Sequence, residues 1–333
     1  MRTIDKLANY IQSTLWFRVT LINYLLLPFS LVYSLIRNLR YYFFQTPVHF
    51  KSKVICVGNS VSGGAGKTPV VIRLAILLKE GDKKVAVVAR GYKGVLSNSK
   101  EAIKVDLDKH SYREVGDETM LVAKYADVFI SANRALAIKE AQKYGAEIII
   151  LDDGFQDNTI HKDLSILVIS SAEIKNKFLI PAGPMRESLN TSLKKADIVI
   201  VPENKQYALQ GKYLVGKEVL KQGQVISNAK ELEGNQYILL CAIAQPDRVV
   251  TTARELGAII KKKHFYPDHY SFSERELKVI YKQAQKYNCK VLTTTKDYVR
   301  LPQDYLEDTA VLKYYVEFDD EEKLREKIYN LFD

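Results

Sequence analysis

Cysteine is scarce in this chain, which has only Cys56, Cys241 and Cys289 among its 333 residues. None of them belongs to a Cys-x-x-Cys pair, and no histidine lies at the spacing of a metal site. These absences exclude a small disulfide-stabilised domain and a zinc-binding module. Because 47% of the residues are apolar, a chain of this length can bury a sizeable core without cross-links. We expect the three thiols to be buried in a reducing compartment.

Internal repeats, low-complexity tracts and recognisable nucleic-acid-binding motifs are also absent from the sequence. The net charge of +10 is concentrated near the amino terminus, where residues 1–53 hold seven lysines and arginines against one acid, Asp5. Basic residues that flank an apolar stretch suit an anionic lipid surface. We therefore expect a membrane lipid surface as a partner and no nucleic acid, and nothing in the sequence indicates an obligate protein partner.

The apolar stretch within this basic region runs from Val19 to Ile36 and is near the lower length limit for a bilayer span. Pro28 lies in its middle, and an aromatic cluster follows at residues 41–44. These features favour a kinked helix that lies in the membrane interface. A single span and a helix packed on the protein are the alternatives. No cleavage site of small residues follows, so a removed signal peptide is not expected.

From residue 54 onward, short apolar runs alternate with helical patterns, which predicts an α/β fold with a largely parallel sheet. Most runs are too uniformly apolar to have one solvated face. Ser273, with Glu276 three residues later, predicts a capped helix start. The strand candidates are 54–57, 85–89, 128–131, 148–151, 164–169, 198–201, 238–241 and 291–294, and the helix candidates are 68–79, 118–124, 134–144 and 274–287.

A polar stretch with several glycines, from about residue 203 to 236, indicates a change of domain. The predicted organisation has four parts. They are a membrane-associated helical segment at 1–50, a phosphate-loop core at 51–205, a linker at 206–236, and a second, smaller α/β domain with a C-terminal helix at 237–333.

A glycine-rich loop lies between the first strand and the first helix of the core. Its backbone N–H groups can wrap a phosphate, Lys67 adds a cation, and the Thr68 hydroxyl can reach Mg²⁺. The strict pattern has glycine where Val61 stands, so this loop departs from the full consensus. Partitioning-type membrane ATPases carry a signature lysine where this chain has Ser62, which argues against that class. The candidate residues for binding ATP are Gly63, Gly64, Ala65, Gly66, Lys67 and Thr68.

Acidic residues follow the strand at 148–151, namely Asp152 and Asp153, with Gln156 shortly after. Because the carboxyl ends of parallel strands line the ligand crevice, these oxygens are placed to hold Mg²⁺ together with Thr68. A turn capped by Asp-Gly is the simpler alternative. We expect Mg²⁺ as the metal, with Asp152, Asp153 and Gln156 around it.

Phosphoryl transfer to a hydroxyl also requires a group that accepts its proton. Asp117 stands at the start of a predicted helix, where an N-cap is the simpler interpretation. His269 lies in a turn-rich loop and, by spacing alone, has no special role. If the two side chains meet in the fold, they can share a proton and act as a base.

Two arginines are candidates for binding anionic groups. Arg90 follows the strand at 85–89, at the expected phosphate edge, where a surface salt bridge is an equal alternative. Arg186 lies in a loop after another strand and is a candidate for an anionic group of the substrate.

These motifs together resemble the tetraacyldisaccharide 4'-kinases of lipid A synthesis. The resemblance runs from the apolar segment almost to the end of the chain, and the motifs occur in the family's order. In addition to the glycine-rich loop, they are Ala89-Arg90-Gly91-Tyr92-Lys93, Gly116-Asp117-Glu118, Leu151-Asp152-Asp153-Gly154-Phe155-Gln156, Pro181-Ala182-Gly183, Arg186-Glu187, Pro267-Asp268-His269-Tyr270 and Thr294-Thr295-Lys296-Asp297.

The resemblance implies a P-loop NTPase-like kinase on the cytoplasmic face of the inner membrane. Its reaction would transfer the γ-phosphoryl group of ATP to the 4'-hydroxyl of an acylated glucosamine disaccharide 1-phosphate. The resemblance further implies two α/β/α domains whose closure completes the site. Asp117 and His269 would form the catalytic dyad, and Arg186 would hold the lipid's phosphate. Asp157 stands where the family usually has histidine, so a substrate contact of that histidine is in doubt here.

A membrane-associated P-loop switch ATPase or GTPase without a lipid product is the alternative function. It would carry a lysine at position 62 or a base-reading motif of the type Asn/Thr-Lys-x-Asp. Thr295-Lys296-Asp297 resembles that motif but lacks the intervening residue.

Overall fold

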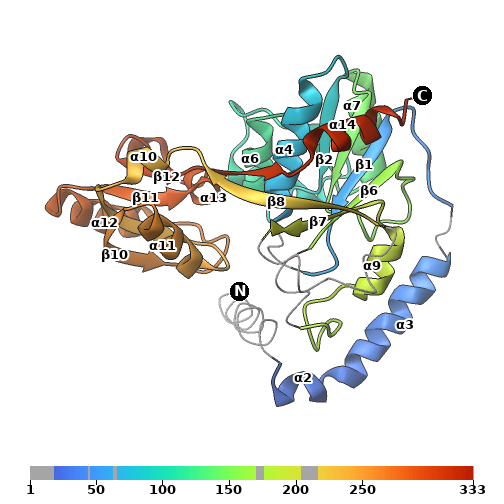
Figure 1. Ribbon diagram of the computed structural model, residues 1–333, viewed down its shortest axis with the longest axis horizontal. Helices are drawn as coiled ribbons and strands as arrows, with labels where there is room; N and C mark the ends of the chain where they lie inside the picture. Colours follow the sequence, from blue (N-terminus) through green and yellow to red (C-terminus); the bar gives the residue numbers. More distant parts are fainter. Residues whose placement is uncertain (1–18, 44–45, 63–65, 170–175, 204–216, 333) are drawn as a thin grey trace.

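The computed structural model describes residues 19–43, 46–62, 66–169, 176–203 and 217–332, which form two α/β units of unequal size (Figure 1). The larger unit is built on a nine-stranded sheet. In sheet order its strands are β13 (Tyr314–Phe318), β8 (Glu218–Ile226), β7 (Ile198–Pro202), β6 (Leu164–Val168), β1 (Lys53–Gly58), β5 (Ile148–Asp152), β2 (Val85–Ala89), β4 (Asp127–Ile130) and β3 (Ile103–Lys104).

Strands of this sheet that were predicted from apolar runs are buried on both faces. β2, for example, is buried along its whole length, as expected for a parallel strand covered by helices. One face is covered by α4 (Lys67–Lys79), α6 (Asp117–Ala123) and α14 (Glu321–Tyr329), and the other by α7 (Arg134–Lys143) and α9 (Leu189–Lys195). Short helices α5 (Tyr112–Val115) and η2 (Val95–Asn98) connect elements at one end. The predicted mostly parallel sheet flanked by helices is confirmed.

The smaller unit has a four-stranded parallel sheet with helices on both faces. The predicted capping box of its longest helix is present, because Ser273 N donates to Glu276 Oε2 at 2.8 Å and Glu276 N donates back to Ser273 Oγ at 3.3 Å. In sheet order its strands are β10 (Ile259–Phe265), β9 (Gln236–Cys241), β11 (Lys290–Thr294) and β12 (Thr309–Leu312), and its helices are α10 (Ala229–Leu232), α11 (Pro246–Glu255), α12 (Glu274–Lys286), α13 (Thr295–Tyr298) and η4 (Gln303–Tyr305).

The two units are joined by a two-stranded ribbon (Figure 1). β8 pairs in parallel with β7 up to Gln222 and then antiparallel with β13 from Gln222 to Ile226. The chain therefore leaves the larger unit along β8 and returns along β13. Part of the predicted linker, residues 206–216, lies outside the described residues. The sequence assigns β13 and α14 to the second unit, but both lie on the larger one, because Leu324 and Ile328 of α14 enter its core beside α4.

The described part of the amino-terminal segment forms two helices, α2 (Leu21–Leu25) and α3 (Leu27–Phe43). They are separated at Leu26, two residues before Pro28, in agreement with the predicted kink. Within the described residues, no helix combines the length and apolar character that a membrane crossing requires. One side of α3 is apolar and exposed to solvent, and includes Leu31, Val32, Leu35, Ile36, Leu39 and Phe43.

Candidate active site

The phosphate loop connects β1 to α4, as the sequence predicts. Gly58 closes the strand where only glycine fits, because a Cβ there would lie 2.4 Å from Phe155 Cβ. Gly66 caps α4 with a φ of 77°, a left-handed conformation that favours glycine. Gly63, Gly64 and Ala65 lie outside the described residues. Lys67 and Thr68 are the first two residues of α4, so the cation and the hydroxyl stand at the helix end that attracts phosphate.

Lys67 already has two oxygen partners. Its Nζ donates to Asn59 Oδ1 at 3.0 Å and lies 3.3 Å from Asp153 Oδ1. Asn59 is buried, and within the described residues its Nδ2 has no hydrogen-bond partner. A buried amide donor beside a phosphate loop is available to an incoming oxygen ligand. Sequence reasoning missed Asn59, since one asparagine after a strand is an ordinary turn residue.

Val61 occupies the place of the missing glycine for a structural reason. It is buried and forms an antiparallel bridge with Met185. Ser62 N donates to the Pro184 carbonyl at 2.8 Å, and Arg186 N donates to the Ser60 carbonyl at 2.7 Å. The first half of the loop is thus bonded to the segment that carries Arg186. Backbone hydrogen bonds therefore fix the phosphate loop and the segment of the predicted substrate arginine to each other.

Asp152 ends β5, the strand next to β1, and pairs in register with Val57. Within the described residues its Oδ1 is buried and lacks a hydrogen-bond partner. Burial raises the pKa of Asp152 to about 7, and the charge of Asp153 adds to this while Lys67 opposes it. A buried carboxylate oxygen that has no hydrogen-bond partner in the protein is suited to bind a cation.

Asp153 is held in a strained conformation, with a φ of 53° that is uncommon outside glycine. Arg186 Nη1 donates to both of its carboxylate oxygens at 3.0 Å, and Arg134 Nη2 donates to its backbone carbonyl at 3.0 Å. Although burial raises the pKa of Asp153, the charges of Lys67 and Arg186 lower it to about 2. Asp153 therefore remains ionised and aimed at the loop.

Gln156 is already engaged at both ends of its amide. Its Nε2 donates to the Asn59 carbonyl at 2.8 Å and lies 3.3 Å from Glu187 Oε1. Its Oε1 accepts from Arg186 Nη1 at 3.2 Å. The structure thus brings Gln156 to the carboxylates, and its oxygen becomes free for another ligand once Arg186 moves.

The predicted proton-sharing pair meets across the two units. His269 Nδ1 lies 2.9 and 3.0 Å from the two carboxylate oxygens of Asp117. Asp117 is the first residue of α6 and follows Gly116, whose φ is 88°. Burial by itself raises the pKa of Asp117, but the hydrogen bond from His269 and the charges of Lys296 and Arg300 lower it to about 2. The simpler interpretation of Asp117 as an N-cap does not describe this geometry.

Two cations near the pair were not assigned a site role from the sequence. Lys296 Nζ lies 3.1 Å from His269 Nε2, and Arg300 Nε lies 3.6 Å from Asp117 Oδ2. Asp297 accepts from Ala242 N at 3.1 Å and from Thr294 Oγ1 at 2.7 Å, and it pairs with Arg300. The segment that resembles a base-reading motif therefore builds a helix start inside the smaller unit. The sequence signals for this segment were its place directly after a buried strand and its match to a motif of the family.

The pair and the metal-binding candidates lie within electrostatic range of each other. The charge of Glu118, next to Asp117, contributes to the raised pKa of Asp152. Arg90 lies exposed at the carboxyl end of β2, and within the described residues no hydrogen bond joins it to this cluster. The structure thus brings together Lys67, Asp152, Asp153, Gln156 and Arg186, with Asp117 and His269 nearby, and leaves Arg90 at the rim.

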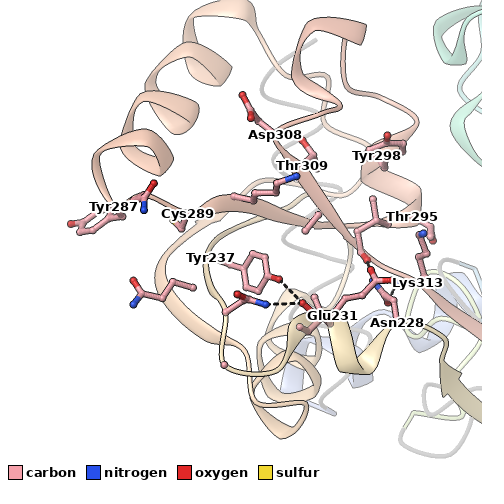
Figure 2. A pocket seen from close by; sticks show the side chains of 18 of the residues that line it. Asn228, Glu231, Tyr237, Tyr287, Cys289, Thr295, Tyr298, Asp308, Thr309 and Lys313 are labelled. Atoms are coloured by element: carbon pink, nitrogen blue, oxygen red, sulfur yellow. Dashed lines mark hydrogen bonds between the residues drawn. The ribbon is translucent and has the colours of Figure 1, made fainter.

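A separate cleft of about 1220 Å³ lies between the C-terminal end of α6 and the smaller unit (Figure 2). Lys124, Tyr298 and Lys313 line it, as do Tyr237 and Asn235, which both donate to the Glu231 carbonyl. None of the predicted site residues lines this cleft. It therefore does not compete with the cluster around Lys67 as the place of the chemistry.

Known proteins resemble the chain over nearly its whole length. A family model described as Tetraacyldisaccharide-1-P 4'-kinase matches residues 22–333. The tetraacyldisaccharide 4'-kinase of Paramagnetospirillum magneticum is 35% identical over 269 residues, which are 80% of this chain and 82% of the relative. That of Rickettsia bellii is 34% identical over 287 residues, 86% and 88% of the two chains.

A solved structure agrees with the sequence relatives. It is the "apo" form of LpxK from Aquifex aeolicus in complex with ATP, which superposes with a TM-score of 0.78 at 30% identity. The match covers 94% of this chain and all of that one. Both units and their connection therefore have counterparts in a protein that was solved with ATP.

Proposed function

The chain belongs to the tetraacyldisaccharide 4'-kinase family, and from this membership we propose a role in the reaction for each residue of the site. It is an ATP-dependent kinase of lipid A biosynthesis that transfers the γ-phosphoryl group to the 4'-hydroxyl of a tetraacyldisaccharide 1-phosphate. No comparison supports the switch ATPase or GTPase alternative. These proposed roles rest on the contact between the phosphate loop and the acids, in which Lys67 Nζ lies 3.3 Å from Asp153 Oδ1.

The ATP phosphates are held by the loop in our proposal. Gly63, Gly64, Ala65 and Gly66 supply backbone N–H groups, and Lys67 leaves Asp153 to neutralise the β- and γ-phosphate oxygens. The start of α4 adds its own positive potential. Asn59 Nδ2, which is buried without a partner in the described part of the chain, is placed to donate to the same oxygens.

Mg²⁺ fits the acids beside this cradle. Asp152 and Asp153 would hold the ion with the Thr68 hydroxyl, and Gln156 would join them with its amide oxygen. The fit rests on Asp152, because burial raises its pKa and its buried Oδ1 has no hydrogen-bond partner among the described residues. When bound, Mg²⁺ supplies neutralisation of the phosphate charge that develops during transfer.

The proton of the 4'-hydroxyl is taken up by the Asp117–His269 pair. The hydroxyl oxygen forms the new bond to the γ-phosphorus while the bond to the β,γ-bridging oxygen breaks and ADP leaves. The pair spans both units, so it forms only when they are docked. Arg186 would hold the lipid's phosphate after exchanging Asp153 for it, and Arg90 at the rim would contact a phosphate oxygen.

The membrane surface is the remaining proposed partner, through the exposed apolar side of α3. Polar residues on the other side of α2 and α3 hold the Arg186 loop. Asn23 Nδ2 donates to the Ala182 carbonyl at 2.7 Å, and Ser30 Oγ donates to the Leu179 carbonyl at 2.8 Å. Tyr33 OH and Arg37 Nη1 both donate to the Arg186 carbonyl, at 3.1 and 3.2 Å. A helix with one lipid-compatible face and one face on the substrate loop suits an enzyme that takes its acceptor from the cytoplasmic face of the inner membrane.

The direct test is transfer of label to lipid. The full chain would be incubated with γ-labelled ATP, Mg²⁺ and a panel of acylated glucosamine disaccharide 1-phosphates in mixed micelles, and the lipids would then be separated. We expect a labelled product with the tetraacyl acceptor. Lys67→Met should lose both product and ATP binding, whereas Lys143→Met, at an exposed helix end, should retain both. ATP consumption without labelled lipid for any acceptor would contradict the proposed chemistry.

A further inference from the structure

Lys296 lies beside the proton-sharing pair, at the junction of the two units. Its Nζ lies 3.0 Å from Glu118 Oε1, 3.3 Å from Asp268 Oδ1 and 3.1 Å from His269 Nε2. The side chain is only 20% exposed. Glu118 belongs to the larger unit and the other two residues to the smaller unit, so the ammonium group bridges the units.

The charge of Lys296 is secured by its surroundings. Burial by itself lowers the pKa of Lys296, but the carboxylates of Glu118, Asp268 and Asp117 raise it above its ordinary value. A lysine ammonium has three donors and no acceptor. At the 3.1 Å contact it can therefore only donate to His269, and Nε2 must be the unprotonated nitrogen of the ring. The ring proton then resides on Nδ1, from which it is donated to Asp117.

Lys296 and His269 share one rigid frame in the smaller unit. Arg300 Nη2 and His269 N both donate to the Ala242 carbonyl, at 3.0 and 3.3 Å. The Ala242 N–H is bound by Asp297, the residue after Lys296. This frame holds His269 at a φ of 62°, a conformation that is sparsely populated and persists only when its surroundings fix it. The distance between the ammonium and the imidazole is therefore set inside the smaller unit.

We propose that Lys296 is a positioning residue for the kinase reaction, which fixes the proton of His269 on Nδ1 and joins the two units through Glu118. It also makes assembly of the proton acceptor depend on docking of the units. The proposal rests on the proposed roles of Asp117 and His269.

The tautomer is tested without any activity measurement. The groups that face His269 are Asp117 from α6, Asp268 and Lys296 from the smaller unit, and Tyr92, whose ring centroid lies 6.0 Å away. In ¹⁵N-histidine NMR of the full chain, with the signal assigned by its loss in His269→Gln, we expect protonated Nδ1 and unprotonated Nε2 at pH 7. In Lys296→Met we expect a mixture of the two tautomers, because no donor then fixes Nε2 as the acceptor and Asp268 Oδ2, at 3.5 Å, can accept a proton from it. A wild-type ring protonated on Nε2 would overturn the proposal.

The kinetic test separates positioning from mere folding. In Lys296→Met we expect kcat about 10-fold lower and KM for ATP unchanged, because the proton acceptor loses its fixed tautomer while the phosphate cradle stays intact. Lys296→Arg should restore the wild-type kcat, and both variants are to be checked for wild-type melting. An unchanged kcat in a folded Lys296→Met would overturn the proposal. Failure of the wild type to label lipid would instead remove the proposed function and leave the NMR result standing.

Discussion

Asp152 and Asp117 are buried carboxylates of the same site, and their pKa values are shifted in opposite directions. Asp152, at the end of β5, has a buried oxygen without a partner among the described residues and a pKa raised to about 7. Asp117, at the start of α6, contacts His269, lies 3.6 Å from Arg300 and has a pKa lowered to about 2. The imidazole and the guanidinium beside Asp117 come from the other unit of the chain, whereas that oxygen of Asp152 has no hydrogen-bond partner in the described part. The difference indicates that the free oxygen of Asp152 is available to a bound ligand, whereas Asp117 obtains its charged partners when the two units dock.

The largest expected effect comes from removing the charge of Asp152. Asp152→Asn should lower kcat by about 1000-fold or more, since one charged oxygen ligand beside the phosphates is lost. The same variant should melt a few degrees higher than the wild type at pH 8 without Mg²⁺, because a buried unpaired charge is removed. Steady-state kinetics and thermal denaturation measure the two effects.

The pH dependence has a definite sign. The folded pKa of Asp152 lies above its unfolded value near 4, so its ionisation destabilises the fold progressively as pH rises from about 4 to about 7. The stability gain in Asp152→Asn should therefore be small at pH 4.5 and full at pH 8. The exposed Asp108→Asn is the matched control and should melt like the wild type at both values. An equal gain at both pH values would mean that Asp152 is not the group that titrates.

A second large effect is expected at the docked carboxylate. Asp117→Asn and His269→Ala should each lower kcat by about 100- to 10,000-fold, because each removes half of the proton acceptor. The dissociation constant for ATP, measured by calorimetry, should change less than about 2-fold, since neither group belongs to the phosphate cradle. The double variant should be hardly worse than either single variant. Wild-type turnover in either single variant would remove the pair from the mechanism.

A moderate effect is expected where the amino-terminal helix holds the Arg186 loop. Arg186 donates to the carboxylate of Asp153, and Tyr33 and Arg37 donate to the backbone carbonyl of Arg186. The double change Tyr33→Phe and Arg37→Ala should raise KM for the lipid about 3- to 10-fold and leave KM for ATP unchanged, because each lost hydrogen bond weakens the loop by roughly 1 kcal/mol.

Leu35→Ser, on the other face of the same helix, is the control for that change. It should weaken binding to anionic vesicles but leave KM for the lipid unchanged in detergent micelles. If Leu35→Ser and the polar double change had the same effect in micelles, the two faces of α3 would not have separate roles.

The smallest effect is expected at Asp157, where the resemblance implies a histidine. Asp157 pairs with Arg134 at 3.3 Å, and Arg134 also holds the Asp153 carbonyl. Asp157→His breaks this ion pair and the hydrogen bonds that Asp157 Oδ1 accepts from Thr159 N at 3.1 Å and Thr159 Oγ1 at 2.6 Å. Each contact is worth about 1 kcal/mol or less. We expect melting to fall by about 2–5 °C and kcat to change less than about 3-fold. A larger loss of kcat would show that Asp157 acts on the reaction itself.

The phosphate half of the site could be predicted because its parts lie next to each other in sequence or follow a rule of sheet topology. Asp152 directly follows an apolar run, and parallel strands bring such ends to one edge. Val61 could not be understood from the sequence, because its reason is a bridge to Met185, far along the chain.

The acid–base half depended on docking, which local patterns do not encode. Asp117 and His269 are 152 residues apart, and each alone has an ordinary interpretation. Lys296 resembled part of a nucleotide base-reading motif, and only the fold places it at His269. β8 and β13 escaped prediction because their alternating polar residues lack the continuous apolar character of the central strands.

The return of the chain along β13 has a consequence for biosynthesis on the ribosome. β8 leaves the ribosome before the entire smaller unit. β13, which pairs with the free edge of β8, emerges last together with α14. Until translation ends, the nascent larger sheet presents an unpaired strand edge and a bare stretch of core beside α4. A stalled or truncated chain would expose both, which marks it for chaperones and proteases.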